Sequence, residues 1–582
     1  MSFPNATKAK VAIIGAGPAG LVTARWLIHH GCVPTVFEAG PGIGGQWNPD
    51  CLSSATWQGL TTNTCRDMSR FSDLDHDQGV PLYPSRLDML HYLQRYVARF
   101  ELAGHVRANC AVRRVEIDGD AFLVSAAGAK GPVVEPFDHV ICASGYEAAP
   151  FVPDIPGLDG FAGALGVLHS SEFRGADRFR GRTVVVAGCS ISALEIASAL
   201  ATGGARRVVS SARRQRYVLP KITAGQPLEA ALMTRMGALA AMHLPSEVSF
   251  AAFGAKVMEM AGNPASYGAR AADANVGLAG ITQSQNFLPL VAEGAIGTAS
   301  WIDRIDGSTV RFADGEQVKA DAIIFATGFR PDLRSISDCM PEDLRGLDHA
   351  PDLFGHSFHP DAPGLAFMGM YNLVGPKLPV LELQARWIAQ VIAGKSTLPA
   401  RAAMDAEIAA HRAQRKAGMD LPMHMAALDF ARRAGVDPDL ARWVDLARPL
   451  LFGPMVPAVF RLEGPDALPH AASEVKESAG RLSGIRDNRL EPEEAAQLAA
   501  IGDAAGFGPQ PMQLVIEAED RSGPQRGVPA IVCLFALGLL ALTKLIGVPE
   551  RTGMEGATVT ASQGAIMPPV QPLHARDDRR SA

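Results

Sequence analysis

The chain has 582 residues, which is too many for one hydrophobic core and predicts two or three domains. Hydrophobic residues make up 47% of it and charged residues 20%, which is ordinary for a globular protein. The net charge of −6 lacks the basic excess typical of nucleic-acid-binding proteins, so no nucleic-acid partner is expected. The eight cysteines form no Cys-x-x-Cys pair and show no zinc-like spacing, which predicts reduced thiols and no metal site.

A glycine-rich loop comes directly after the first apolar run of the chain, residues 11–14. In a dinucleotide-binding loop of this spacing, Gly15 permits the tight turn and Gly17 lets the backbone approach a pyrophosphate. Gly20 then allows the helix to pack closely against the strand. The next apolar run ends in Glu38, whose carboxylate accepts hydrogen bonds from free ribose hydroxyls. This loop therefore predicts a site for FAD or NAD.

A second loop of the same kind comes after the apolar run at residues 184–187. It begins at Gly188, and Ala193 stands where the third glycine is expected. Alanine is small enough to preserve the close approach of helix and strand. Ser190 and Ser192 are candidates to donate hydrogen bonds to phosphate oxygens. The sequence predicts a second nucleotide site here.

The two loops differ in the charge at the end of the next strand. After the second loop, that strand ends near Arg213 and Arg214 rather than at an acid. A guanidinium there accommodates a ribose 2′-phosphate, so the second site is predicted to bind NADPH. Arg213 has the better register, and one of the two arginines is expected to be only a solvated charge. A chain that holds both nucleotides is expected to pass a hydride between them.

Alternating apolar strands and helices around both loops predict an α/β fold with two Rossmann-like domains. Residues 139–145 and 322–329 share one pattern, an apolar strand followed by glycine, and we interpret both as crossings between the domains. The NADPH-binding domain is therefore predicted to be inserted into the FAD-binding domain. The expected segments are 1–157 and 321–472 for the FAD domain, 158–320 for the NADPH domain, 473–527 for a loosely packed polar extension, 528–548 for a hydrophobic helix and 549–582 for a disordered tail.

The hydrophobic stretch at residues 528–548 is 21 residues long and contains one charge, Lys544. That length suffices for a helix to cross a bilayer, and a lysine near its end reaches the interface. The stretch therefore predicts a membrane anchor. The alternative is a buried helix packed on the body of the protein. Elsewhere, residues 85–102 show helical periodicity, and residues 225–295 are expected to form alanine-rich helices that cap the site.

Several short blocks accompany the two loops, namely Gly44-Gly45-Gln46-Trp47, Thr61-Thr62-Asn63-Thr64, Tyr83-Pro84-Ser85, Ala326-Thr327-Gly328-Phe329, Gln384-Ala385-Arg386-Trp387 and the stretch 452–465. Together with the loops, these blocks resemble the flavin-containing monooxygenases, class B flavoproteins that oxygenate soft nitrogen and sulfur atoms. The resemblance extends from about residue 10 to residue 472 and keeps the order of blocks in that family.

The sequence departs from this family in one identifying motif. Phe161-Ala162-Gly163 precedes His169 by two residues more than the family pattern allows. The segment from His169 to Phe173 fits the second half of the motif, and Phe173 stands where Baeyer–Villiger monooxygenases would place tryptophan. The departure predicts a local difference in the linker, and Phe173 favours the flavin-containing monooxygenase branch.

The resemblance also implies roles for particular residues. Asn63 is the candidate catalytic residue, because its neutral amide would hydrogen-bond the flavin peroxide or the nicotinamide without protonating the peroxide. The alternative is an asparagine that caps a turn. Trp47 is equally compatible with a core aromatic. The remaining FAD-binding candidates are Gln46, Trp47, Thr62, Thr327, Gly328 and Gln384.

The activity implied is an NADPH- and O2-dependent monooxygenase that oxygenates amines or thioethers through a C4a-hydroperoxyflavin. One alternative is a Baeyer–Villiger or N-hydroxylating monooxygenase with the same cofactors. Another is a membrane-docked NADPH-dependent flavin electron-transfer protein that inserts no oxygen. We expect a cytoplasmic enzyme body anchored to a membrane at its C-terminal end, and the sequence leaves a homo-oligomer open.

Overall fold

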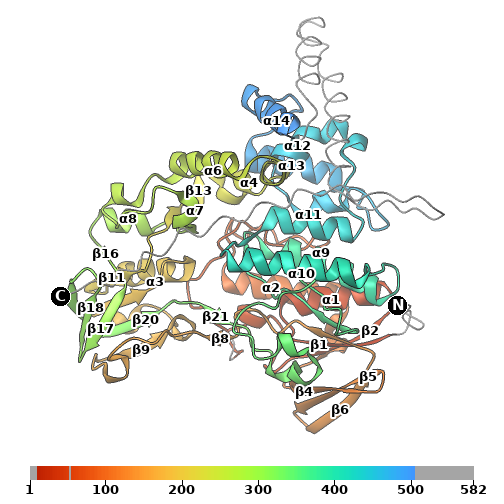
Figure 1. The fold of residues 1–582 in the computed structure, drawn as a ribbon, viewed down its shortest axis with the longest axis horizontal. Helices are drawn as coiled ribbons and strands as arrows, with labels where there is room; N and C mark the ends of the chain where they lie inside the picture. Colours follow the sequence, from red (N-terminus) through yellow and green to blue (C-terminus); the bar gives the residue numbers. More distant parts are fainter. Residues whose placement is uncertain (1–8, 52–53, 505–582) are drawn as a thin grey trace, which may run out of the picture.

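Two parallel sheets form the two halves of the molecule, and a computed structural model describes them over residues 9–51 and 54–504 (Figure 1). The first sheet contains the N-terminal strand at its centre and holds five strands. All of its pairings are parallel. In spatial order the strands are β22 (Leu365–Phe367), β7 (His139–Cys142), β1 (Lys10–Ile14), β2 (Val33–Phe37) and β3 (Val106–Arg107).

The second sheet also has five parallel strands, arranged in nearly the same order. The two sheets differ at one edge strand. In the second sheet this strand precedes the central strand in the chain, whereas the corresponding strand β22 of the first sheet follows the central strand β1. In spatial order the strands are β16 (Ile296–Ala299), β11 (Arg207–Ser211), β10 (Thr183–Ala187), β20 (Ala322–Phe325) and β9 (Gly166–His169). The predicted α/β class with two Rossmann-like units agrees with this topology.

Burial on both faces explains why these runs become central strands. Every residue of β10 and of β20 is buried, as expected for parallel strands covered by helices on both sides. Each central strand leads through a glycine loop into a helix, α1 (Pro18–His29) after β1 and α3 (Ile191–Thr202) after β10. Gly17 and Ser190 are the N-cap residues of these helices.

A three-stranded antiparallel sheet is inserted at the same point of each half. In the first half it comes between β3 and β7, and in the second half between β16 and β20. Figure 1 shows one such sheet at each end of the molecule. The first consists of β4 (Ala111–Asp118), β5 (Ala121–Gly128) and β6 (Gly131–Phe137). The second consists of β17 (Ile302–Asp306), β18 (Thr309–Phe312) and β19 (Gln317–Lys319). The two halves are therefore built on one plan.

The chain crosses between the halves twice, at neighbouring points. Strand β8 (Ala149–Pro150) leaves the first half and pairs antiparallel with β21 (Phe329–Arg330), which returns to it. This agrees with the interpretation of 139–145 and 322–329 as crossings. The predicted boundary at residue 320 is too early, however, because β20 pairs with β10 and β9 and so belongs to the inserted half. The strand pattern at 322–325 is the same in either sheet, so it does not reveal which sheet the strand joins.

Helices cover the first sheet and join it to the C-terminal part of the chain. Helix α9 (Lys377–Ile392) packs against α1, and α11 (Met423–Arg433) packs against α9. The predicted helix at 85–102 is observed as α2 (Arg86–Arg99), which Ser85 begins with a capping box to Asp88. The exposed helix α10 (Arg401–Lys416) and the short strands β23 (Leu373–Val374) and β24 (Leu421–Pro422) complete this region.

The region expected to hold capping helices is largely helical. Within residues 225–295 lie β14 (Gln226–Pro227), α4 (Leu228–Leu232), α5 (Arg235–His243), α6 (Ser246–Ala261), α7 (Val276–Ala279), β15 (Ile281–Gln283) and α8 (Phe287–Ala292). The short strands β12 (Tyr217–Leu219) and β13 (Ile222–Thr223) come just before this region. Strand β12 pairs with β15, and α6 packs on β12. This places the helices beside the second sheet and next to the C-terminal helices (Figure 1).

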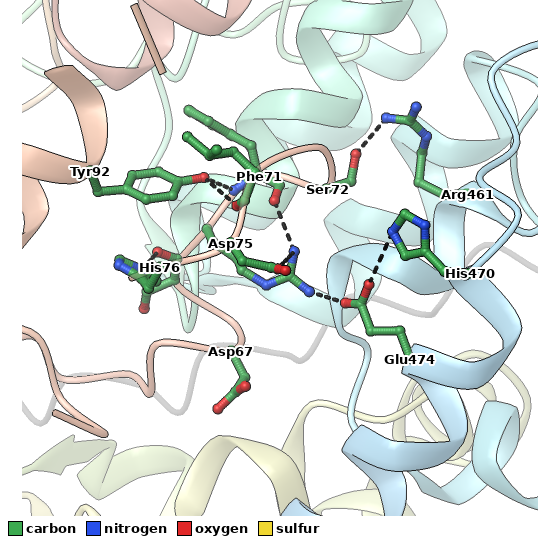
Figure 2. Close-up of polar contacts among 12 residues, drawn as sticks. Asp67, Phe71, Ser72, Asp75, His76, Tyr92, Arg461, His470 and Glu474 are labelled. Atoms are coloured by element: carbon green, nitrogen blue, oxygen red, sulfur yellow. Dashed lines mark hydrogen bonds and ion pairs between the residues drawn. The ribbon is translucent and has the colours of Figure 1, made fainter. Parts of the chain in front are cut away.

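The extension after residue 472 is not loosely packed in its first part. Helix α13 (Ala471–Ser483) buries Val475, Ala479 and Leu482, and it contacts α12 (Ala447–Phe452) and α4. Figure 2 shows Glu474 of α13 facing the loop that carries Asp67, Ser72 and Asp75; Glu474 pairs there with Arg70. The expectation of loose packing was wrong because it rested on the polar composition of the segment, which includes a narrow apolar stripe on one face of α13. A further helix, α14 (Pro492–Ala504), comes next.

Within the described residues, no helix is both long enough and apolar enough to cross a bilayer. The predicted anchor at 528–548 and the predicted tail at 549–582 lie outside the described part of the chain.

Acid stability gives a test of the packing between α11 and the inserted region. His424 on α11 places its Nδ1 atom 3.2 Å from the sulfur of Met233, and burial lowers the pKa of His424 to about 4. The ordinary value is near 6.5, so this histidine contributes stability above pH 6.5 that is lost as the pH falls toward 4. The loss is at most about 1.4 kcal/mol per pH unit.

We therefore expect His424→Gln to lose less stability than the wild type between pH 7.5 and pH 5. The measurement is the urea midpoint of each protein at the two pH values. His91→Gln, which replaces an exposed histidine of α2, is the matched control. An equal loss in the wild type and in His424→Gln would contradict this role of His424.

Candidate functional site

The first glycine loop is packed against the end of the neighbouring strand. Gly15 has a φ of +109°, and an added Cβ would lie 2.6 Å from the carbonyl oxygen of Ala143. A Cβ on Gly20 would lie 1.9 Å from the carbonyl oxygen of Gly15. The parallel register brings Gly15 against Ala143, because Ile14 pairs with both Phe37 and Cys142 and the three strands end at the same level. Only glycine fits at these two positions.

Glu38 lies where the sequence predicted it, at the end of β2 beside the loop. Its carboxylate is buried and accepts hydrogen bonds from the backbone N–H groups of Ala16, at 2.8 Å, and Gly40, at 2.6 Å. These bonds fix the carboxylate at the carboxyl edge of the sheet. A carboxylate has further lone pairs, so ribose hydroxyls can still donate to it.

The Gly44-Gly45-Gln46-Trp47 block folds directly onto this loop. The N–H of Gly44 donates to the carbonyl oxygen of Ala16 at 2.9 Å, and a Cβ on Gly45 would lie 3.0 Å from Cα of Gly17. Gln46 is exposed, and Trp47 is partly buried against the core of the first half. Sequence segments almost thirty residues apart therefore meet at the first glycine loop.

The second loop repeats the geometry of the first. Gly188 has a φ of +138°, and its added Cβ would lie 2.4 Å from the carbonyl oxygen of Ala326, which corresponds to Ala143. Ala193 is fully buried, which agrees with the close approach predicted for it. Ser190 and Ser192 are exposed at the start of α3, and the Ser190 side chain forms no capping bond. The loop therefore presents free hydroxyls at a helix N-terminus.

Arginines gather at the end of β11, beside the second loop. Arg213 is exposed and stacks over Trp301 at 4.9 Å, while Arg214 donates to the carbonyl oxygen of Leu278 at 3.0 Å. Two further arginines of this group were not predicted from the sequence. Arg270 donates to the carbonyl oxygen of Ala212 at 2.7 Å, and Arg216 lies on the same segment as Arg214.

The charges of Arg216 and Arg270 reach the second loop itself. Burial raises the pKa of the Cys189 thiol, and both guanidinium groups act in the opposite direction. The first loop has an acid at the corresponding edge and the second a group of cations. This difference was the basis for assigning the two nucleotides from sequence.

Asn63 belongs to a segment held by backbone pairing to the Tyr83-Pro84-Ser85 block. The N–H of Thr62 donates to the carbonyl oxygen of Pro84 at 2.8 Å, and Thr61 forms a bridge with Ser85. The Oδ1 atom of Asn63 is buried and has no hydrogen-bond partner among the described residues. Buried polar atoms are nearly always hydrogen-bonded, so this oxygen keeps the capacity to accept a further hydrogen bond. A turn-capping role would have used it.

Two charged residues of the inserted half reach this same segment, and sequence reasoning did not find them. Lys221 and Glu229 are both buried, and each bonds to residues next to Asn63. The contacts join positions about 160 residues apart, so no local spacing could reveal them. The only local signal was charge within an apolar, alanine-rich stretch. Cys65 is buried, and burial raises the pKa of its thiol.

Thr327 and Gly328 lie in the returning crossing, at the end of β20. The Thr327 hydroxyl donates to the carbonyl oxygen of Phe151, and the carbonyl oxygen of Gly328 accepts from Phe151 N–H and from His169, both at 3.0 Å. His169 ends β9, and Phe173 packs against Trp57. The altered family motif thus ties the inserted half to the crossing.

Gln384 does not reach the site in the way expected. Its side chain is fully buried, and its oxygen accepts from Gly369 N–H and the Tyr371 hydroxyl, each at 3.0 Å. Its amide nitrogen donates to Ser357 at 2.9 Å and to two backbone carbonyls. Both ends of the amide are occupied by protein groups. Gln384 therefore ties α9 to the strand end at β22, and the helical position alone did not distinguish this role.

An open depression of about 500 Å³ lies elsewhere, between the loop 66–79 and α13. Arg70 pairs there with Asp75 and Glu474, and Arg481 pairs with Asp67. Its lining includes no residue of either glycine loop. The depression therefore lies apart from both glycine loops.

Two dinucleotide loops of one plan, one edged by an acid and the other by arginines, define a two-nucleotide oxidoreductase. A model of the flavin-binding monooxygenase-like family matches residues 8–493, and the chain belongs to that family. The match continues past residue 472 and includes α13, which agrees with the packing of that helix.

Relatives and solved structures agree with this family. The chain is 28% identical over 487 residues to dimethylaniline monooxygenase [N-oxide-forming] 2 of Cavia porcellus, covering 78% of this chain and 89% of the relative. The fold resembles S-allyl-L-cysteine S-oxygenase from Allium sativum, with a TM-score of 0.56, 24% identity, and coverage of 82% and 99%. It also resembles cyclohexanone monooxygenase, with a TM-score of 0.54, 19% identity, and coverage of 74% and 97%.

Membership in the family makes the chain a flavin-containing monooxygenase, with FAD and NADPH as its cofactors, as predicted. The residues present fit such groups. Two glycine cradles leave no room for a Cβ, a cluster of arginines borders one of them, and the buried oxygen of Asn63 is free to accept from a ligand.

The glycine cradle gives a direct test. We expect Gly20→Ala to purify with much less FAD than the wild type, because its Cβ would displace the backbone of the loop. The measurement is flavin absorbance relative to protein absorbance. Gly104→Ala, at a position with open space around the added carbon, is the control. Full FAD content in Gly20→Ala would contradict the role of the loop.

Proposed function

We propose that the enzyme uses NADPH and O2 to oxygenate soft nucleophilic nitrogen or sulfur atoms, as in amines and thioethers. The observation that carries the proposal is the buried amide oxygen of Asn63, which has no partner within residues 9–51 and 54–504, in a block that resembles the flavin-containing monooxygenases. The names of the relatives support it, since an N-oxide-forming enzyme is among them.

In this proposal the first loop holds FAD and the second holds NADPH. Gly15, Gly17 and Gly20 form the pyrophosphate cradle of FAD, and Glu38 accepts from its ribose. Gln46, Trp47 and Thr62 line the same side of the site. When bound, the flavin would accept a hydride and activate dioxygen. The protein holds both nucleotides and the substrate in one site that excludes water.

The second loop binds NADPH through different charges. Gly188 and Ala193 let the backbone approach the pyrophosphate, and Ser190 and Ser192 donate to it at the N-terminus of α3. Arg213 binds the 2′-phosphate, while Arg214, which donates to a backbone carbonyl, is the less suited of the pair. Thr327 and Gly328 contribute from the crossing between the halves.

Asn63 acts as a neutral hydrogen-bonding residue beside the reacting atoms. An amide holds a donor or acceptor in place without carrying a transferable proton, so it does not promote wasteful release of hydrogen peroxide. The Cys65 thiol nearby stays protonated because burial raises its pKa, so no thiolate competes as a nucleophile.

Two alternatives are distinguished by product. A Baeyer–Villiger or N-hydroxylating enzyme would share the fold, since a cyclohexanone monooxygenase is among the structures with this architecture. Phe173 in the linker motif favours oxygenation of nitrogen and sulfur. An electron-transfer protein would consume NADPH without forming any oxygenated product.

Membrane anchoring through 528–548, with the enzyme body in the cytoplasm, stays a prediction.

The first test replaces the proposed catalytic amide. We expect Asn63→Ala to bind FAD and to be reduced by NADPH at a rate near that of the wild type. Product formation from trimethylamine or methyl phenyl sulfide should fall by about 100-fold, with hydrogen peroxide released instead. Anaerobic reduction, N-oxide or sulfoxide yield and peroxide are measured together. Unchanged product formation would remove Asn63 from the mechanism.

A second test addresses the choice of nucleotide. Arg213→Ala should raise the KM for NADPH about tenfold or more and leave the KM for NADH nearly unchanged, because only NADPH carries the 2′-phosphate. Steady-state oxidation of both nucleotides provides the comparison. Arg214→Ala serves as the neighbouring control. Equal effects on NADPH and NADH would disprove a 2′-phosphate contact.

A further inference from the structure

The segment that carries Asn63 is held from the opposite half of the molecule. The backbone N–H of Cys65, two residues after Asn63, donates to Oε1 of Glu229 at 2.5 Å. Glu229 lies on α4, in the inserted half, and its side chain is almost completely buried. Its other oxygen, Oε2, is buried without a partner among the described residues. One carboxylate of the inserted half therefore fixes the backbone beside the proposed catalytic amide.

A lysine of the inserted half binds the other side of the same segment. The Nζ atom of Lys221 donates to Oγ1 of Thr61 and to the carbonyl oxygen of Thr62, both at 3.3 Å. The carbonyl oxygen of Lys221 in turn accepts from the Tyr83 hydroxyl at 2.6 Å. Lys221 and Glu229 thus contact residues on both sides of Asn63 in the chain.

The same lysine is linked to the helix that begins at the second glycine loop. Glu195 of α3 lies 3.9 Å from Nζ of Lys221 and accepts from Ser284 at 2.8 Å. Helix α3 starts at Ser190, the N-cap residue of the second loop. A continuous set of polar contacts therefore runs from α3 through Lys221 to the segment of Asn63.

The geometry of this cluster favours a positioning role, because each side chain makes its hydrogen bonds to backbone or hydroxyl groups. Burial lowers the pKa of Lys221 and raises that of Glu229. Neither residue belongs to a glycine loop. Buried charges are costly to keep without a role, and here they connect two halves that the chain links only by two short crossings.

We propose that Glu229 and Lys221 are positioning residues that hold Asn63 in its working place from the inserted half of the protein. This inference rests on the role proposed above for Asn63. The coupling of NADPH oxidation to oxygenation then depends on these two side chains, although neither touches the substrate. Loss of the Glu229 contact frees the Cys65 amide, and loss of Lys221 leaves the Thr62 carbonyl without its donor.

The experiment compares Glu229→Ala with Glu229→Gln in the full-length enzyme loaded with FAD. Glutamine keeps an oxygen that can accept from Cys65 N–H, so Glu229→Gln should stay close to the wild type. In Glu229→Ala the product formed per NADPH should fall by about tenfold or more, because displacement of about 1 Å at a reacting site costs on the order of 100-fold. FAD content and the rate of anaerobic reduction should be retained.

Lys221 is tested in the same way, by comparing Lys221→Met with the conservative Lys221→Arg, which keeps donors for Thr61 and Thr62. Glu247→Ala makes the same substitution as Glu229→Ala at an exposed position on α6 and is its matched control. Trimethylamine and methyl phenyl sulfide are the substrate probes. A structural readout accompanies the kinetics, namely hydrogen exchange of the backbone amides in the peptide 60–68. Exchange should quicken in Glu229→Ala and Lys221→Met only.

The outcomes separate this inference from the proposed function. If the wild type oxygenates neither probe, the proposed function fails, and the exchange data alone decide whether Glu229 and Lys221 hold the segment. If the wild type oxygenates a probe and Glu229→Ala is equally well coupled, the positioning role is overturned. It is also overturned if Glu229→Gln and Glu229→Ala lose coupling equally, because retention of an acceptor would then be irrelevant.

Discussion

The structure depends on one close contact, made twice, between a glycine loop and the end of the neighbouring parallel strand. Gly15 lies against the carbonyl oxygen of Ala143, and Gly188 against that of Ala326, each at a distance that excludes a Cβ. The contact is possible because parallel register ends three strands at the same edge of each sheet. It leaves an open edge at which a helix N-terminus faces a nucleotide.

Because the two glycine loops have the same backbone geometry, the chemical difference between them comes from the side chains at their borders. Glu38 places an anchored carboxylate at the first, and Arg213 with its neighbours places cations at the second. The contacts that join the halves arise from neither cradle. Lys221 and Glu229 extend from the inserted half to the segment of Asn63, so the proposed reaction centre is assembled from both units.

Local sequence was sufficient for features whose cause is local. Glycine spacing, a buried apolar run and the acid or arginine after the next strand predicted both loops, and helical periodicity over residues 85–102 predicted α2. The assignment of β20 failed because an apolar strand does not reveal which sheet it joins. Gln384 was placed wrongly because its partners are backbone and hydroxyl groups brought together by folding. Lys221 and Glu229 were missed for the same reason, since their partners lie far away in the chain.

The paired crossings have a consequence for how such a protein can arise. Strands β8 and β21 run side by side, so the chain leaves the first half and re-enters it at adjacent positions. Removing everything between them would leave two ends close enough to be rejoined by a short turn. The second nucleotide unit can therefore be gained or lost at a single splice point, without reordering the strands of the first sheet. Its antiparallel insert and its loop geometry repeat those of the first half.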